Sequence, residues 1–132
     1  MVEFAMVFPL FMLVLAGILD FGFALYTRMT VINAAGAGAN AAVMGSDYST
    51  VSTVATGAAD AAAAQGGVTP SSVTTICLQT TSSITAPPTI ACSSAKLGDS
   101  VSVTVNYTYK TFFPLMFGAS FNMSSTVQMV IS

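Results

Sequence analysis

The chain has 132 residues, of which only 6% are charged and 54% are hydrophobic, and it contains no histidine. This length allows one domain, or a long helix with a small head, but not two independent cores. Since soluble domains carry about a quarter of their residues as charged side chains, much of this surface should face lipid or neighbouring subunits. The net charge of -2, without a basic cluster, excludes nucleic-acid binding. Without histidine we expect no enzyme, no cofactor and no metal site.

The first segment predicts a hydrophobic helix. An unbroken apolar run extends from Phe4 to Leu19 and resumes after Asp20. A helix from Glu3 to Asp20 rises roughly 25 Å, close to the roughly 30 Å hydrocarbon core of a bilayer. The two carboxylates should therefore lie near opposite interfaces. Pro9, inside the run, should remove one backbone hydrogen bond and bend or loosen the helix.

A secretory signal peptide is the alternative interpretation of this segment. Such a peptide has basic residues before its apolar stretch and a small-residue cleavage site after it. No Lys or Arg precedes Arg28, so we favour a retained membrane anchor.

Residues 27–64 are rich in Ala and Gly, which favours helix. We predict one long hydrophobic helix over residues 1–44, a turn near Gly45 to Ser49, and a shorter helix, capped by Asp47 or Ser49, that ends near Gln65. Small residues let helix backbones approach closely, so we expect tight helix packing. A flexible Ala/Gly linker is the alternative.

The rest of the head, which spans residues 45–132, predicts strands. Residues 72–81 favour a strand and residues 84–99 a loop, and residues 112–118 form a hydrophobic connector before a last strand at 123–132. The fold class is therefore α+β: a long N-terminal hydrophobic helix, a short second helix, and an antiparallel sheet of three or four strands on the upper helix. The clearest alternation lies in residues 100–111, where one face carries Val101, Val103, Val105, Tyr107 and Tyr109.

The two cysteines, Cys77 and Cys92, lie in this Thr/Ser-rich part of the chain. An even pair favours a disulfide over a metal site, and over two buried thiols. The bridge would close a loop of about 15 residues and add about 3 kcal/mol of stability in the chain-entropy model. It also indicates an oxidising compartment.

The N-terminal segment carries an ordered pattern: an acidic residue with Phe-Ala, an apolar run with an early Pro, Gly-Ile, an acidic residue with Phe-Gly, an aromatic-X-Arg step, and Asn-Ala-Ala. This pattern resembles the signature of TadE-like pseudopilins, within the wider type IV pilin superfamily. Residues 101–118, followed by a Ser/Thr-rich last strand, also resemble the usual ending of such proteins. The N-terminal pattern consists of Glu3, Phe4, Pro9, Gly17, Ile18, Asp20, Phe21, Gly22, Tyr26, Arg28, Asn33, Ala34 and Ala35.

The resemblance implies a precursor that a prepilin peptidase trims after a basic leader. No such leader is present in this sequence, which we expect of a processed chain. The resemblance further implies a subunit that is inserted in the cytoplasmic (inner) membrane and then assembled by the pilus machinery. The expected product is an extracellular helical filament of identical subunits, joined through their N-terminal helices.

Four residues are candidates for assembly: Glu3, Pro9, Asp20 and Arg28. The resemblance implies that Glu3 pairs with the N-terminal ammonium of an adjacent subunit; a merely interfacial carboxylate is the alternative. Asp20 and Arg28 are about two helical turns apart, so they share a face but are too distant to pair within one helix. Pairing between subunits and solvation at the membrane edge both stay open for them.

Two other functions compete with a filament subunit. One is a minor TadE-like pseudopilin that primes or caps a pilus. The other is a single-span membrane protein with an extracytoplasmic binding head, which would be monomeric in detergent.

Overall fold

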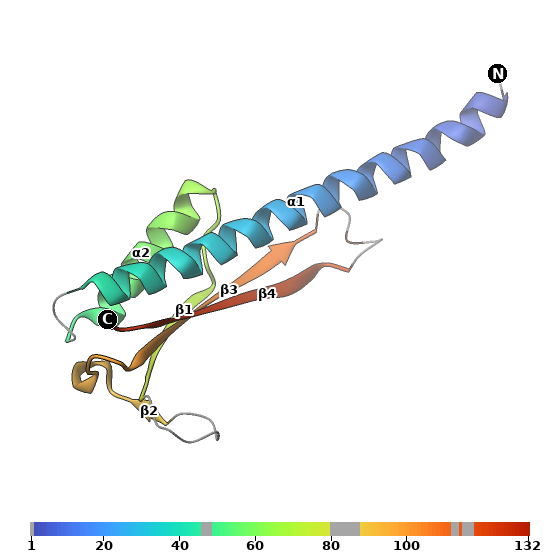
Figure 1. Ribbon diagram of the computed structural model, residues 1–132. Coiled ribbons are helices and arrows are strands. Elements are labelled where there is room, and N and C mark those ends of the chain that lie inside the picture. The colour runs from blue at the N-terminus through green and yellow to red at the C-terminus, as the bar shows by residue number, and fades with distance from the viewer. Residues whose placement is uncertain (1, 46–48, 80–87, 112–113, 115–117) are drawn as a thin grey trace.

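The computed structural model describes residues 2–45, 49–79, 88–111, 114 and 118–132, without the side chains of Val2, Glu3 and Ala5 (Figure 1). It has the predicted α+β fold: a long apolar helix, a short helix and a four-stranded antiparallel sheet. In chain order the elements are α1 (Val2–Met44), α2 (Val51–Gln65), β1 (Ser72–Leu78), β2 (Thr89–Ile90), the short 3-10 helix η1 (Cys92–Ser94), β3 (Ser100–Lys110) and β4 (Ser120–Val130).

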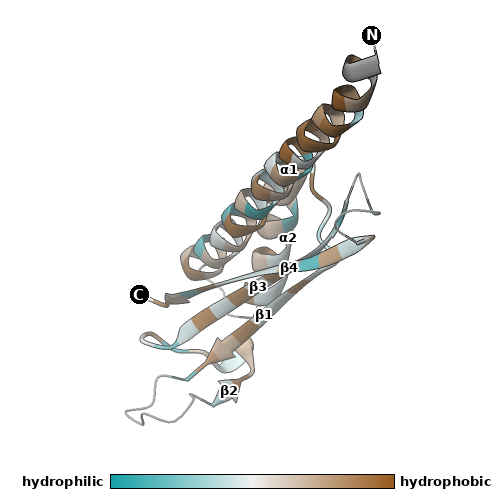
Figure 2. Cartoon of the chain, turned by 90° about the vertical axis from the view of Figure 1, so that its right-hand side faces the viewer, coloured by the Kyte–Doolittle hydropathy of each residue, from teal (hydrophilic) through white to brown (hydrophobic). Residues whose placement is uncertain are grey.

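Helix α1 is continuous and contains Pro9, so the proline does not end it. The N-terminal half extends away from the rest of the chain, whereas the C-terminal half lies on the sheet and beside α2 (Figure 1). We call the exposed part, residues 4–19, the stem, and the remainder of the fold the head. In Figure 2 the stem has the brown colour of hydrophobic residues along most of its length.

The Ala/Gly-rich part of the chain forms a close pair of helices and not a flexible linker. Gly38 lies where α1 approaches α2: a Cβ atom there would come 2.8 Å from the Ala55 carbonyl oxygen. The tight packing expected from the small residues is therefore made within one chain. The buried alanines of the pair are Ala34, Ala35, Ala39 and Ala42 on α1, and Ala55, Ala59 and Ala63 on α2.

Helix α2 begins at Val51, later in the chain than a cap at either Asp47 or Ser49 would place its first residue. Thr50 is its N-cap, with no side-chain capping hydrogen bond, and Asp47 lies outside the described residues. At the other end Gly66 and Gly67 donate backbone hydrogen bonds to Ala63 and Ala64. Gly67 has a φ of 69°, a left-handed conformation that glycine adopts without strain.

The sheet has the strand order β2-β1-β3-β4, and every neighbouring pair is antiparallel. The expected loop at 84–99 contains β2 and η1, and β4 begins at Ser120, before the predicted start. Most of the 112–118 connector lies outside the described residues. β3 and β4 pair without interruption from Ser100↔Val130 to Lys110↔Ser120.

The predicted alternation of β3 is confirmed. Val101, Val103 and Val105 are fully buried against α1 and α2, Tyr109 is buried and Tyr107 is half-buried. Between Ser102 and Thr108 the opposite face of β3 is polar and uncharged, and so are its partners on β4. Its side chains bond across strands: the Thr104 and Thr126 hydroxyls lie 2.8 Å apart, and Thr108 donates to Asn122 at 2.9 Å.

Candidate assembly surface

The stem is an apolar surface that nothing in the described chain covers. From Phe4 to Leu19 no described side chain is buried, and exposed fractions reach 73% at Phe4, 78% at Met6 and 64% at Ile18. Helix α1 has the length and apolarity to cross a membrane, and most of its apolar window is unburied. A helix that is apolar all round needs lipid or other helices as neighbours.

Of the predicted assembly residues, Pro9 lies on this stem and Glu3 directly precedes it. Pro9 is inside α1 in the exposed stretch. The backbone of Glu3 belongs to the first turn of α1, but its side chain lies outside the described residues, so its pairing stays a prediction.

Asp20 marks the point where the stem meets the head. Its side chain is only 4% exposed, and its Oδ1 accepts a 2.7 Å hydrogen bond from the Tyr109 hydroxyl. The same hydroxyl lies 3.3 Å from the Asp20 carbonyl oxygen. Asp20 is thus bound to the sheet of its own chain and is not solvated at the membrane edge.

Tyr109 is held in its neutral form by this environment. Burial, followed by the hydrogen bond to the Asp20 carboxylate, raises the pKa of Tyr109 to about 12. The phenol therefore stays a donor to Asp20 throughout the physiological pH range. Sequence reasoning placed Tyr109 on the buried face of β3 but missed this contact, because the two residues are 89 positions apart.

A hollow of about 400 Å³ lies at the junction of stem and head. Tyr109 and Phe121 pair across β3 and β4 there, with ring centroids 5.1 Å apart, and Phe121 is 42% exposed. The exposed apolar surface of the stem therefore continues to the edge of the sheet. The lining residues are Asp20, Phe21, Ala24, Tyr109, Thr111 and Phe121.

Arg28 lies outside this junction. Its side chain is exposed beside the β4 edge of the sheet and forms no ion pair among the described residues. The fold does not bring Asp20 and Arg28 together. Asp20 accepts a hydrogen bond from Tyr109, whereas Arg28 lies beside β4. Pairing of either residue between subunits stays a prediction.

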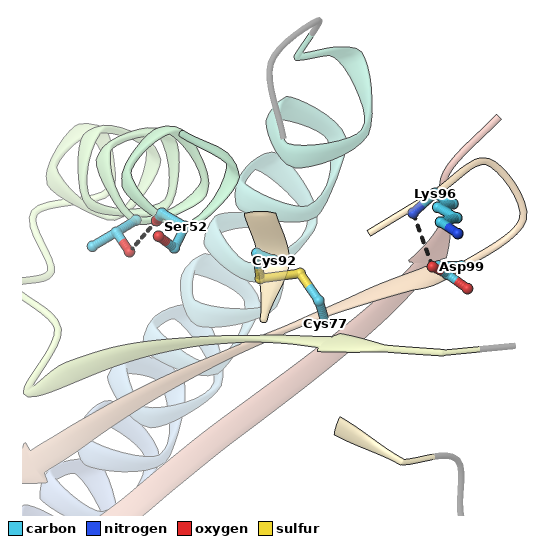
Figure 3. Close-up of a disulfide and its surroundings, with 6 residues drawn as sticks. Ser52, Cys77, Cys92, Lys96 and Asp99 are labelled. Carbon is cyan, nitrogen blue, oxygen red and sulfur yellow. Dashed lines mark hydrogen bonds between the residues drawn. A yellow bond between two sulfur atoms is a disulfide. The ribbon is translucent and has the colours of Figure 1, made fainter. Parts of the chain in front are cut away.

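The predicted disulfide joins Cys77 of β1 to Cys92 of η1, with Cα atoms 5.2 Å apart (Figure 3). Cys77 is fully buried in the core beneath the helices. Close by, the Asp99 carboxylate accepts a 2.9 Å hydrogen bond from the Lys96 backbone N–H. The bridge ties η1 to the sheet through β1.

Comparison with known proteins matches the N-terminal segment of the chain to a family model. No curated protein and no solved structure matches the chain significantly. The model of the TadE-like protein family matches residues 1–40, which include the stem, Asp20 and Arg28. The N-terminal segment of this chain is therefore TadE-like, which confirms the resemblance identified in its sequence.

Proposed function

We propose that this chain is a structural subunit of a type IV-like pilus, which self-assembles through its stem into an extracellular filament. The observation that carries this proposal is the stem, an exposed apolar helix that continues into a folded head. In water each large apolar side chain left exposed forgoes about 1.5–3 kcal/mol. The stem must therefore be covered, by lipid before assembly and by other stems afterwards.

Apolar surface alone does not drive a stem from lipid into a bundle of stems, because lipid tails are as apolar as the side chains. A carboxylate in lipid, however, carries a penalty of about 2.5–3.5 kcal/mol near the bilayer centre and less toward the interface, and pairing with a cation reduces this penalty. Glu3 lies at the N-terminal end of the stem, where a neighbour's terminal ammonium would pair with it. We therefore propose that Glu3 provides the preference for assembly.

One observation favours a minor pseudopilin that primes or caps the pilus. The small-residue face of α1, which suits close helix packing, is occupied by α2 of the same chain. The Ala/Gly run therefore gives no support to the tighter packing between subunits that a major subunit would use. The single-span alternative predicts a chain that stays monomeric in detergent and builds no filament.

Glu3→Ala tests the proposal. Expressed with a pilus machinery that assembles the wild-type chain, this variant should yield at least about tenfold fewer filaments, because the lost pairing is worth more than about 1.4 kcal/mol. Sheared fibres are counted by negative-stain microscopy with antibody labelling. Labelling along each fibre would identify a major subunit, and labelling at one end a minor one.

The exposed Phe4→Leu is the matched control, since it changes the neighbouring stem residue without changing charge. It should assemble normally, and both variants should keep the Cys77–Cys92 bridge and the unfolding midpoint of the wild-type head. Normal fibre yield from Glu3→Ala would contradict the pairing, and a wild-type chain that never enters fibres would contradict the filament itself.

A further inference from the structure

Strand β4 forms one border of the sheet and is open to a further strand. In the described part of the chain it pairs only with β3, over its full length from Ser120 to Val130 (Figure 1). It contains no charge, no proline and no interruption of register. Edge strands normally carry such features to prevent pairing with other chains. A long edge without them is a template for strand addition.

A groove runs along this edge. It has a volume of about 370 Å³ and lies between α1 and the helix-facing side of β4. Phe121 and Met123 are only partly covered there, although they face the helix layer. An added strand would extend the sheet beneath α1, and every second side chain of that strand would enter the groove. The lining residues are Arg28, Val31, Phe121, Asn122, Met123, Ser124 and Ser125.

Arg28 makes this groove favourable for a negatively charged side chain of a binding partner. It is one of only three basic residues in the chain, it is exposed at the groove, and no described carboxylate pairs with it. The neighbouring residues of β4 are all uncharged. A guanidinium in this position favours a carboxylate on the incoming strand and disfavours a cation.

A second copy of the chain does not fit these requirements. Copies anchored in one membrane by their stems hold β4 in the same direction, so two β4 strands cannot pair antiparallel; this step rests on the proposed membrane anchoring. Nor does a copy offer an exposed carboxylate on a described strand: Asp20 and Asp60 are in helices, and Asp99 is buried. The occupant is therefore a different polypeptide.

We infer that the β4 edge binds an extended segment of another protein by strand addition, and that Arg28 pairs with an acidic residue of that segment. The segment alternates apolar or acidic side chains facing the groove with Ser- or Thr-like side chains on the polar face. Main-chain hydrogen bonds to β4 provide affinity, and Arg28 provides selectivity for the acidic residue. Such an edge would couple this subunit to a non-identical component.

Peptide binding to the full chain in detergent micelles tests this inference, and it does not depend on filament assembly. The probe is a short, Ser-flanked peptide in which Thr and Val alternate around one central Glu, measured by fluorescence anisotropy. It should bind at least about fivefold more tightly than the same peptide with Lys in place of Glu, because the Arg28 guanidinium attracts a carboxylate and repels an ammonium group. A peptide methylated at alternate backbone nitrogens should not bind, because it cannot form the ladder.

Arg28→Glu should reverse the preference between the two peptides, and Lys96→Glu, at an exposed cation away from the groove, should leave it unchanged. The inference is overturned if no probe binds, if the Glu and Lys peptides bind equally, or if the methylated peptide binds as well as the unmodified one. Dimerisation of the chain that excludes the probes would identify a second copy as the occupant and would also overturn it.

Discussion

Asp20 and Tyr109 determine how the stem leaves the head. A carboxylate at the end of an apolar run would ordinarily be expected to face water, but here it is buried against the C-terminal end of β3. The hydrogen bond joins the two segments that carry the family resemblance, the N-terminal pattern that contains Asp20 and the later strand that contains Tyr109. The direction of the stem is therefore fixed by one buried polar contact together with the packing around it.

Tyr109→Phe should destabilise the head by about 1.5–3 kcal/mol. The substitution keeps the ring contact with Phe121 but removes a hydrogen bond to a charged acceptor, which leaves the buried Asp20 carboxylate less well satisfied. Urea unfolding followed by circular dichroism in a mild detergent measures the change. Tyr107→Phe is the control, because the Tyr107 hydroxyl makes no hydrogen bond among the described residues; an equal loss in both variants would contradict this account.

The raised pKa of Tyr109 predicts a loss of stability at alkaline pH. The folded state favours the neutral phenol, with a pKa of about 12 against 10.0 for an ordinary tyrosine. The stabilisation is therefore complete below pH 10 and is lost as the pH rises toward 12. In a titration followed by phenolate absorbance, the ionisation at the highest pH should belong to Tyr109, and Tyr109→Phe should remove it. A wild-type titration without a delayed step would disprove the burial of this hydroxyl.

At the scale of elements, the α1–α2 pair organises the head. Alanine and glycine let the two helix axes approach closely, and the valines of β3 pack beneath them. The close contact at Gly38 involves Ala55, Ala59 and Val103, so this one position touches both helices and the sheet. Position 38 requires glycine because there is no room for a Cβ atom, and not because the backbone adopts an unusual conformation there.

Gly38→Ala and Gly36→Ala should change stability in opposite directions. At Gly38 a methyl group would meet the Ala55 carbonyl oxygen at 2.8 Å, so the two helices would have to separate. This separation costs more than alanine gains in helix propensity, and we expect a net loss of stability of about 1–2 kcal/mol. At Gly36 nothing lies within 4 Å, so alanine should add up to about 1 kcal/mol. Thermal unfolding of both variants measures the pair. Equal stabilisation by both would show that α1 and α2 do not pack as described.

At the scale of the whole molecule, α1 runs from the stem into the head, and its two parts have different surroundings. The sequence suggested a division after residue 44, where α1 ends. The packing argues for a functional boundary near Asp20, because α1 contributes Val31 and its buried alanines to the core of the head.

A chain of residues 20–132 should therefore fold, whereas residues 45–132 should not. The longer fragment keeps the core helix and the Asp20–Tyr109 bond, and the shorter one exposes the apolar faces of α2 and the sheet. Amide hydrogen exchange of β3 in each fragment distinguishes the two. Strong protection in residues 45–132 alone would show that the head does not need α1.

The sequence by itself determined the element types and the character of the stem, since continuous apolarity, alanine content and strict alternation are local signals. The boundaries of α1 and the buried face of β3 follow from these local signals. The candidate disulfide follows from the even pair of cysteines. Assignments that depended on a cap or a loop were less accurate: α2 starts at Val51, and the expected loop contains β2 and η1.

Only the tertiary structure decided what the polar and small residues contact. Asp20 meets Tyr109, the Ala/Gly run meets α2 of the same chain, and Arg28 is left beside an open sheet edge. These partners lie on different elements, and pairing of distant elements leaves no periodic signal in a single sequence. The physical reason is that a local pattern records whether a side chain is buried, whereas its partner is set by the way in which the elements pack.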